Sequence, residues 1–147
     1  NRQLPELLST GLSRPPRPSG SSGVPLSSFA RVVRGIATGA NDFFFLTARQ
    51  MADHGLDSHF FRRAVGRTRD CPRGVITLDD LAELDAAGRP TWLLNLDRQP
   101  VESLPPALRR YLHRGEEAGT ADRALIKTRS PWYRMEQRTE PGLLFLL

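Results

Sequence analysis

The chain has 147 residues, of which 21 are basic and 16 acidic, so it carries a net charge of +5 and has a pI near 10.6. This length leaves room for one domain of ordinary size, and the single cysteine, Cys71, excludes an internal disulfide and a cysteine-rich zinc site. No apolar run reaches the length of a membrane span. We therefore expect a cytoplasmic protein with no metal site and no membrane partner, whose positive charge suits a polyanion such as DNA.

The first 25 residues are predicted to be a linker. Residues 9–25 consist mainly of Ser, Gly, Pro and Arg, and their four prolines exclude regular structure. Residues 4–8 fit the last turn of a preceding helix. We therefore divide the chain into an interdomain linker, residues 1–25, and a folded domain, residues 26–147. Because this domain ends in an apolar strand, we expect it to be truncated at its C-terminus.

The segment over residues 29–46 predicts two apolar strands joined by a polar loop. The loop contains Gly35 and Gly39, and the second strand, residues 43–46, contains three adjacent phenylalanines. Glycine accepts positive φ, so such a loop lets the backbone approach a ligand closely. An ordinary hairpin turn needs the same residue types, and both interpretations stay open at this point.

A helix, a basic run and an acidic segment follow in order. Thr47 as the N-cap and Gly55 as the C-terminal stop predict a helix over residues 47–54. Residues 62–73 contain five arginines and one acidic residue. This run is either a solvated loop or a face that contacts phosphates. Residues 76–86 carry dense carboxylates, which we assign to solvent rather than to a metal or to DNA.

The C-terminal half predicts a central strand and a long helix. Residues 91–97 form a nearly continuous apolar run, typical of a strand that is buried on both faces. Residues 104–115 predict a helix, because two prolines stand at its first turn and a glycine at its end. Residues 124–127 and 143–147 predict further strands. Together these elements predict an α+β fold: a small mixed, mainly antiparallel sheet with about three helices.

Two blocks of the sequence carry a resemblance to a known family. Residues 32–44 read Val-Val-Arg-Gly-Ile-Ala-Thr-Gly-Ala-Asn-Asp-Phe-Phe, and residues 127–133 read Lys-Thr-Arg-Ser-Pro-Trp-Tyr, followed by Glu-Pro-Gly and the apolar end. In this order they resemble the target-recognition region of adenine-specific (N6) DNA methyltransferases, of the Eco57I-like and type I restriction-modification kinds. The resemblance implies a DNA-binding fragment of a site-specific bacterial adenine-N6 methyltransferase.

The resemblance also implies what this fragment leaves to the rest of its parent enzyme. Such enzymes hold S-adenosylmethionine in a glycine-rich loop and the flipped adenine in an Asn-Pro-Pro-Tyr or Asn-Pro-Pro-Phe tetrapeptide, and neither motif occurs in this chain. We therefore expect no catalytic residues here and no catalysis by the fragment alone. The implied partners are double-stranded DNA and the catalytic methyltransferase domain of the same parent chain, which would bind S-adenosylmethionine.

We predict nucleic-acid contacts from the two blocks and the basic run, at Arg34, Thr38, Asn41, Arg62, Arg63, Arg67, Lys127, Arg129, Trp132 and Tyr133. By resemblance, Asn41 would pair with an adenine edge and Arg129 with guanine or phosphate. Trp132 and Tyr133 would stack on an unpaired base, although an aromatic pair after proline is more often part of the core. The alternative function is a protein-interaction domain whose apolar C-terminal strand, residues 143–147, adds to a partner's sheet.

Overall fold

The computed structural model describes residues 23–31, 34–71 and 75–138, and these fall into two parts, one ending at Arg34 and the other beginning at Gly35. In the first part, the 3-10 helix η1 (Leu26–Ser28) is closed by a hydrogen bond of 2.9 Å from the Ser28 amide to the Pro25 carbonyl. Most of the predicted linker lies outside the described residues. The strand predicted over residues 29–33 is wrong in its described part, because residues 29–31 pair with no strand there to receive their backbone hydrogen bonds.

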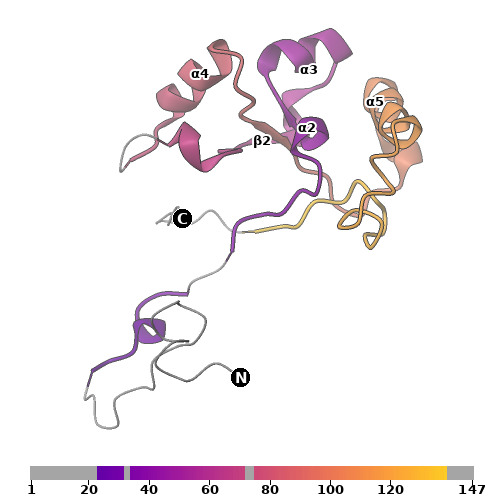
Figure 1. Cartoon of the computed structure of the whole chain (residues 1–147). Helices are drawn as coiled ribbons and strands as arrows, with labels where there is room; N and C mark the ends of the chain where they lie inside the picture. The colour runs from indigo at the N-terminus through magenta and orange to yellow at the C-terminus, as the bar shows by residue number, and fades with distance from the viewer. Residues whose placement is uncertain (1–22, 32–33, 72–74, 139–147) are drawn as a thin grey trace, which may run out of the picture. The chain divides into compact units, whose positions relative to one another are not determined.

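An antiparallel sheet is the framework of the second part (Figure 1). Within the described residues it has three strands in the order β1-β3-β2, namely β1 (Phe45–Leu46), β2 (Phe61–Arg63) and β3 (Trp92–Leu94). Leu93 pairs with Phe45 of one edge strand, and Leu94 pairs with Phe61 of the other. Both leucines are buried, so the central strand predicted within residues 91–97 is confirmed.

A short parallel contact follows β3 in the chain. Leu96 forms a parallel bridge with Arg134, and the Met135 amide donates a hydrogen bond of 2.7 Å to the Leu96 carbonyl. The three-stranded sheet itself is antiparallel, and this isolated parallel bridge lies outside its strands. Together with the helices around it, this arrangement confirms the predicted α+β class.

Four α-helices are found in the described part of the chain, which is one more than expected. They are α2 (Asn41–Phe44), α3 (Ala48–His54), α4 (Leu78–Ala86) and α5 (Pro106–Glu117), and short 3-10 helices occur at η2 (Ser58–Phe60), η3 (Thr68–Asp70) and η4 (Val101–Ser103). Figure 1 shows α4 and α5 at opposite sides of this part, with α3 between them. None of the helices described is long and apolar enough to cross a membrane.

Helix α3 has the ends that its sequence predicts. The Thr47 side chain accepts a hydrogen bond of 3.2 Å from the Gln50 amide, and the Gln50 side chain accepts one of 2.8 Å from the Thr47 amide. This reciprocal pair satisfies two amides that the first helical turn leaves without partners. At the other end Gly55 has φ of +65°, the left-handed conformation that ends a helix and favours glycine.

The strand predicted over residues 43–46 is only half formed. The amides of Phe43 and Phe44 both donate to the Ala40 carbonyl, at 3.1 and 2.9 Å, and this makes a helical turn, α2, out of the first half. Only Phe45 and Leu46 remain extended as β1. The phenylalanine run is nevertheless buried, since Phe44 has no exposed surface and Phe45 is 8% exposed.

Two predictions in the C-terminal half are wrong. Gly115 does not end its helix, because α5 continues to Glu117 and its last carbonyls are capped by the following residues. Gly115 instead allows a close approach: a Cβ atom there would lie 2.6 Å from the Phe43 ring. Residues 124–127 are not a strand but a series of turns, in which the Ile126 and Lys127 amides both donate to the Arg123 carbonyl. The strand predicted over residues 143–147 lies outside the described residues.

Helix α5 contributes a large share of the core. Its Leu108, Tyr111 and Leu112 are buried at helical spacing, which confirms that they serve packing. The Tyr111 ring stacks on the Phe43 ring with centroids 4.7 Å apart, and its hydroxyl donates a hydrogen bond of 2.6 Å to the Phe43 carbonyl. These contacts join α5 to α2, at the start of the sheet.

Candidate nucleic-acid interface

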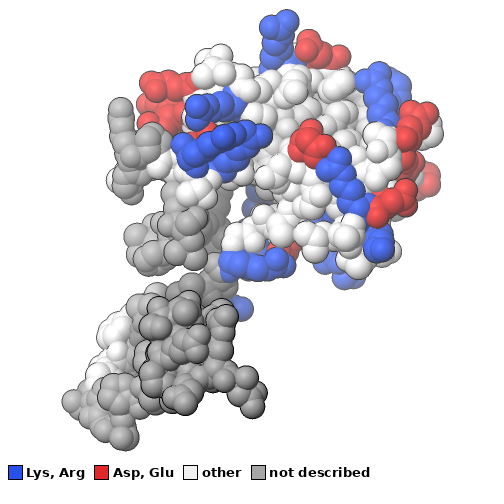
Figure 2. Space-filling view, viewed as in Figure 1, with Lys and Arg blue, Asp and Glu red and all other residues white. Residues whose placement is uncertain are grey.

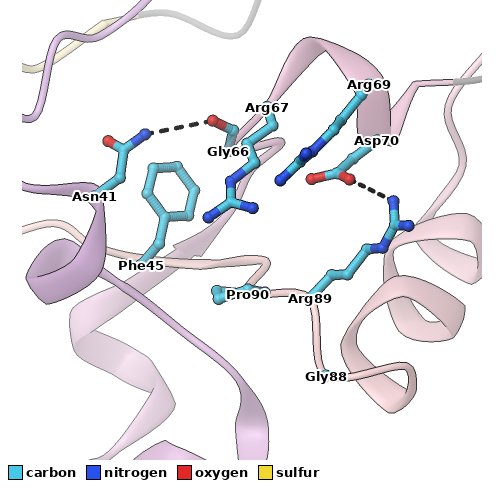
Figure 3. A pocket seen from close by; sticks show the side chains of 9 residues that line it. All are labelled: Asn41, Phe45, Gly66, Arg67, Arg69, Asp70, Gly88, Arg89 and Pro90. Carbon is cyan, nitrogen blue, oxygen red and sulfur yellow. Dashed lines mark hydrogen bonds and ion pairs between the residues drawn. The ribbon is translucent and has the colours of Figure 1, made fainter.

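A cleft of about 530 Å³ opens on the surface of the second part (Figure 3). Three segments that are distant in the sequence meet there: the consecutive α2 and β1, the loop that leads into η3 together with η3, and the turn after α4. The lining residues are Asn41, Phe45, Gly66, Arg67, Arg69, Asp70, Gly88, Arg89 and Pro90. The cleft floor is apolar where Gly66 lies over the Phe45 ring, since a Cβ atom on Gly66 would be 3.5 Å from that ring.

The cleft carries more positive than negative charge. Three of its lining residues are arginines and one is an aspartate, so the lining has a net charge of 3 − 1 = +2. Arg89 donates to the buried carboxylate of Asp70 at 2.6 Å, whereas the guanidinium groups of Arg67 and Arg69 make no hydrogen bond or ion pair within the described residues. Figure 2 shows basic side chains gathered beside the acidic ones of the α4 region on this face.

Asn41 stands at the edge of the cleft with its side-chain amide held in one orientation. The Thr38 hydroxyl donates to Asn41 Oδ1, and Asn41 Nδ2 donates to the Gly66 carbonyl at 3.4 Å. Thr38 is itself buried and accepts a hydrogen bond of 3.2 Å from the Ala40 amide. An amide oxygen has two lone pairs and an amide nitrogen two hydrogens, so Asn41 retains one acceptor and one donor for a ligand.

Arg129 joins the two sequence blocks that carry the family resemblance. Its Nη2 donates to the carbonyls of Ala37 and Thr38, at 2.7 and 2.8 Å, and its guanidinium lies 5.7 Å from the Phe44 ring centroid. Burial lowers the pKa of the Arg129 guanidinium. Arg129 therefore stabilises the backbone of the polar loop. Its predicted contact with guanine or phosphate stays a prediction.

Trp132 and Tyr133 both pack against the rest of the domain. Tyr133 is 4% exposed, and its hydroxyl donates a hydrogen bond of 2.7 Å to the Gln99 carbonyl. Trp132 is half-buried, with its ring centroid 5.5 Å from that of Phe43, and its indole Nε1 donates to Glu116 at 2.8 Å. Burial raises the pKa of the Tyr133 phenol. In this arrangement the pair belongs to the core, and stacking on a base stays a prediction.

The other residues predicted to contact nucleic acid do not line the cleft. Arg63 lies over the Trp92 ring at 4.5 Å, while the exposed Arg62 donates to the Arg138 carbonyl at 3.5 Å. Lys127 is exposed among the turns of the C-terminal half, and Arg34 belongs to the first part of the chain. Of the predicted residues, the structure brings only Asn41 and Arg67 together in the cleft, with Thr38 directly behind Asn41.

Sequence reasoning did not select two arginines of the cleft, Arg69 and Arg89. Arg69 belongs to the basic run over residues 62–73, and that run is the sequence feature that could have indicated it as a contact. Arg89 lies in a Gly-Arg-Pro turn, and nothing in its local sequence indicates that it approaches Asp70. Among residues 23–31, 34–71 and 75–138, no three His, Cys, Asp or Glu side chains are grouped as a metal site would need.

The fold and the cleft define a small α+β domain with a basic concave surface. The family model of the C-terminal domain of the type II methyltransferase M.Eco57I matches residues 19–147, and the chain belongs to this family. The type II methyltransferase M.AccI of Acinetobacter calcoaceticus is 30% identical over 115 residues. This match covers 78% of the chain but 21% of M.AccI, so the chain spans about a fifth of that relative's length. No solved structure matches the chain.

Proposed function

We propose that this chain is the DNA target-recognition region of a site-specific adenine-N6 DNA methyltransferase of the restriction-modification kind, and that it does not catalyse methyl transfer alone. The observation that carries the proposal is the arginine-lined cleft, because it occurs in a C-terminal domain of a type II methyltransferase. Guanidinium groups suit the phosphates of DNA, whose charge supplies most of the affinity that is independent of sequence.

The proposed division of labour places binding in this chain and chemistry in the rest of a cytoplasmic parent protein. Basic side chains would set the register on double-stranded DNA, and polar side chains near them would contact base edges. The catalytic domain would bind S-adenosylmethionine and receive the adenine after it has been flipped out of the stack. Residues 1–25 would then link that catalytic domain to the recognition region over residues 26–147.

Of the remaining predicted contacts, Arg34, Arg62 and Lys127 are exposed and would add phosphate contacts outside the cleft. The alternative, a protein-interaction domain that pairs through residues 143–147, depends on residues outside the described ranges. No contact in the described part of the chain favours it.

A titration of the 147-residue chain with a fluorescently labelled DNA duplex of mixed sequence tests this function. If the chain neutralises about three phosphates, the dissociation constant should rise roughly 40-fold between about 50 mM and 200 mM salt, because the logarithm of the affinity falls with a slope near −0.9 per phosphate. No binding at low salt, or binding that does not respond to salt, would contradict DNA recognition by this chain.

A further inference from the structure

We propose that the cleft seats one backbone phosphate on Arg67 and Arg69, and that this places the adjoining base edge against the side-chain amide of Asn41. The inference rests on the proposed function and makes it specific. Within one cleft, two arginines would bind the DNA backbone and one asparagine would contact a base edge. It also names as a contact Arg69, which the sequence places in the basic run but not among the predicted contacts.

The two arginines are built to face a ligand rather than the protein. Arg67 precedes the 3-10 helix η3 and Arg69 lies within it, and the turn is fixed by a hydrogen bond of 3.0 Å from the Asp70 amide to the Arg67 carbonyl. Both side chains are exposed and, as described above, have no protein partner within the described ranges. Figure 3 shows both guanidinium groups directed into the cleft. A planar guanidinium matches the geometry of phosphate oxygens.

The third arginine of the cleft has a different role. Arg89 is held by Asp70 at 2.6 Å, and Asp70 is 7% exposed. A buried carboxylate needs such a partner, so this pair forms the wall between η3 and the turn after α4. Because Asp70 offsets the charge of Arg89, the net charge of the cleft comes from Arg67 and Arg69, which is where an anion would bind.

The size and the polar groups of the cleft fit a single nucleotide unit. A volume of about 530 Å³ is far too small for a duplex, but it is within the range of sites that bind a small molecule. Asn41 lies on the same rim, and its remaining donor and acceptor are the pair that an adenine edge requires. Since Thr38 and Gly66 hold the amide in place, no side-chain rotation is needed before it meets a base.

The phosphate half of the proposal is tested with Arg67→Gln and Arg69→Gln, each titrated with labelled mixed-sequence duplex over a range of salt. Each variant should weaken binding equally for all sequences, and the double variant, which empties the one phosphate site, should flatten the salt dependence by about 0.9 in slope. The matched control is Arg109→Gln, which removes the same charge from an exposed position on α5, on the opposite side of this part from α4 (Figure 1). This control should bind as the unchanged chain does.

The outcomes separate this site from the broader function. If the unchanged chain binds DNA in a salt-dependent way and the two cleft variants bind equally well, DNA recognition stands and the phosphate site is wrong. The same conclusion follows if Arg109→Gln loses as much as they do. If the unchanged chain does not bind DNA, both the function and the site are wrong.

The base-reading half is tested by selecting preferred sites from randomised duplexes with the chain and with Asn41→Ala. The variant should lose a preference of about 5- to 150-fold at one base pair while its salt slope stays the same. Thr38→Val, which removes the hydroxyl that orients the amide, should reduce the same preference. Equal weakening across all sequences would make Asn41 a backbone contact and overturn this half. Thermal melts of both variants establish that they are folded.

Discussion

Substituting alanine for Gly115 should destabilise the domain, although alanine is the better helix former. Gly115 lies inside α5 and is buried. A Cβ atom there would be 2.6 and 2.7 Å from two carbons of the Phe43 ring and 2.9 Å from the Trp132 ring. Both rings are themselves fixed, because Phe43 stacks on Tyr111 and the Trp132 indole is bonded to Glu116.

Two opposing effects set the size of the change. The helix propensity of alanine exceeds that of glycine by about 1 kcal/mol in a helix interior. Forcing a methyl group into a packed core costs about 3 kcal/mol when, as here, the neighbours are aromatic rings that cannot rotate away. The net loss should therefore be about 2 kcal/mol, which lowers the melting midpoint by roughly 6–9 °C for a chain of this size.

Urea and thermal unfolding followed by circular dichroism measure this loss. The matched control is Gly35→Ala, because a Cβ atom on Gly35 would meet nothing within 4 Å, and its free energy of unfolding should hardly change. In Gly115→Ala combined with Phe43→Leu, the cost should be less than the sum of the two single costs, since the smaller side chain removes the clash. A Gly115→Ala chain as stable as the original would refute the packing argument.

Two further predictions concern buried polar groups. Arg129→Met should cost about 1–3 kcal/mol in urea unfolding, because the carbonyls of Ala37 and Thr38 lose their donor, and a variant of unchanged stability would show that these bonds contribute nothing. Burial raises the pKa of both tyrosines, Tyr111 and Tyr133, so the folded chain holds these protons more tightly than the unfolded chain does. Their contribution to the free energy of unfolding is complete below the ordinary tyrosine pKa near 10 and is lost as the pH rises above it. Tyrosinate absorbance should therefore appear together with unfolding. Tyrosinate in a chain that is still folded at that pH would contradict this expectation.

The sequence predicts best where a local signal is strong. The reciprocal cap at Thr47, the left-handed Gly55 and the apolar run around β3 are each determined by neighbouring residues, and the structure has them as expected. The α+β class follows from these elements. The two resemblance blocks also identify the family correctly, because their residue types and order are specific enough without knowledge of the fold.

The sequence predicts poorly where tertiary contacts decide. In the sequence, Gly115 predicts the end of a helix. The structure has it inside α5, where the close approach of Phe43 from a distant segment requires a residue without a side chain. Residues 124–127 have the composition of a strand, but turns bury Ile126 while leaving Leu125 exposed. The cleft depends on Arg89 meeting Asp70 across 19 residues, and no local pattern carries that information.

The bonds from Arg129 to the polar loop have a consequence for recombination between related chains. Its guanidinium and the two carbonyls that it holds are separated by 92 and 91 residues. A genetic crossover between those positions would combine a loop from one ancestor with an anchor from another. Because the acceptors are backbone carbonyls, these bonds survive such a crossover where the incoming segment keeps an arginine at the position of Arg129 and a loop with the same backbone course. Recombination should therefore give folded chimeras between relatives that share both features, although the two segments lie far apart in the sequence.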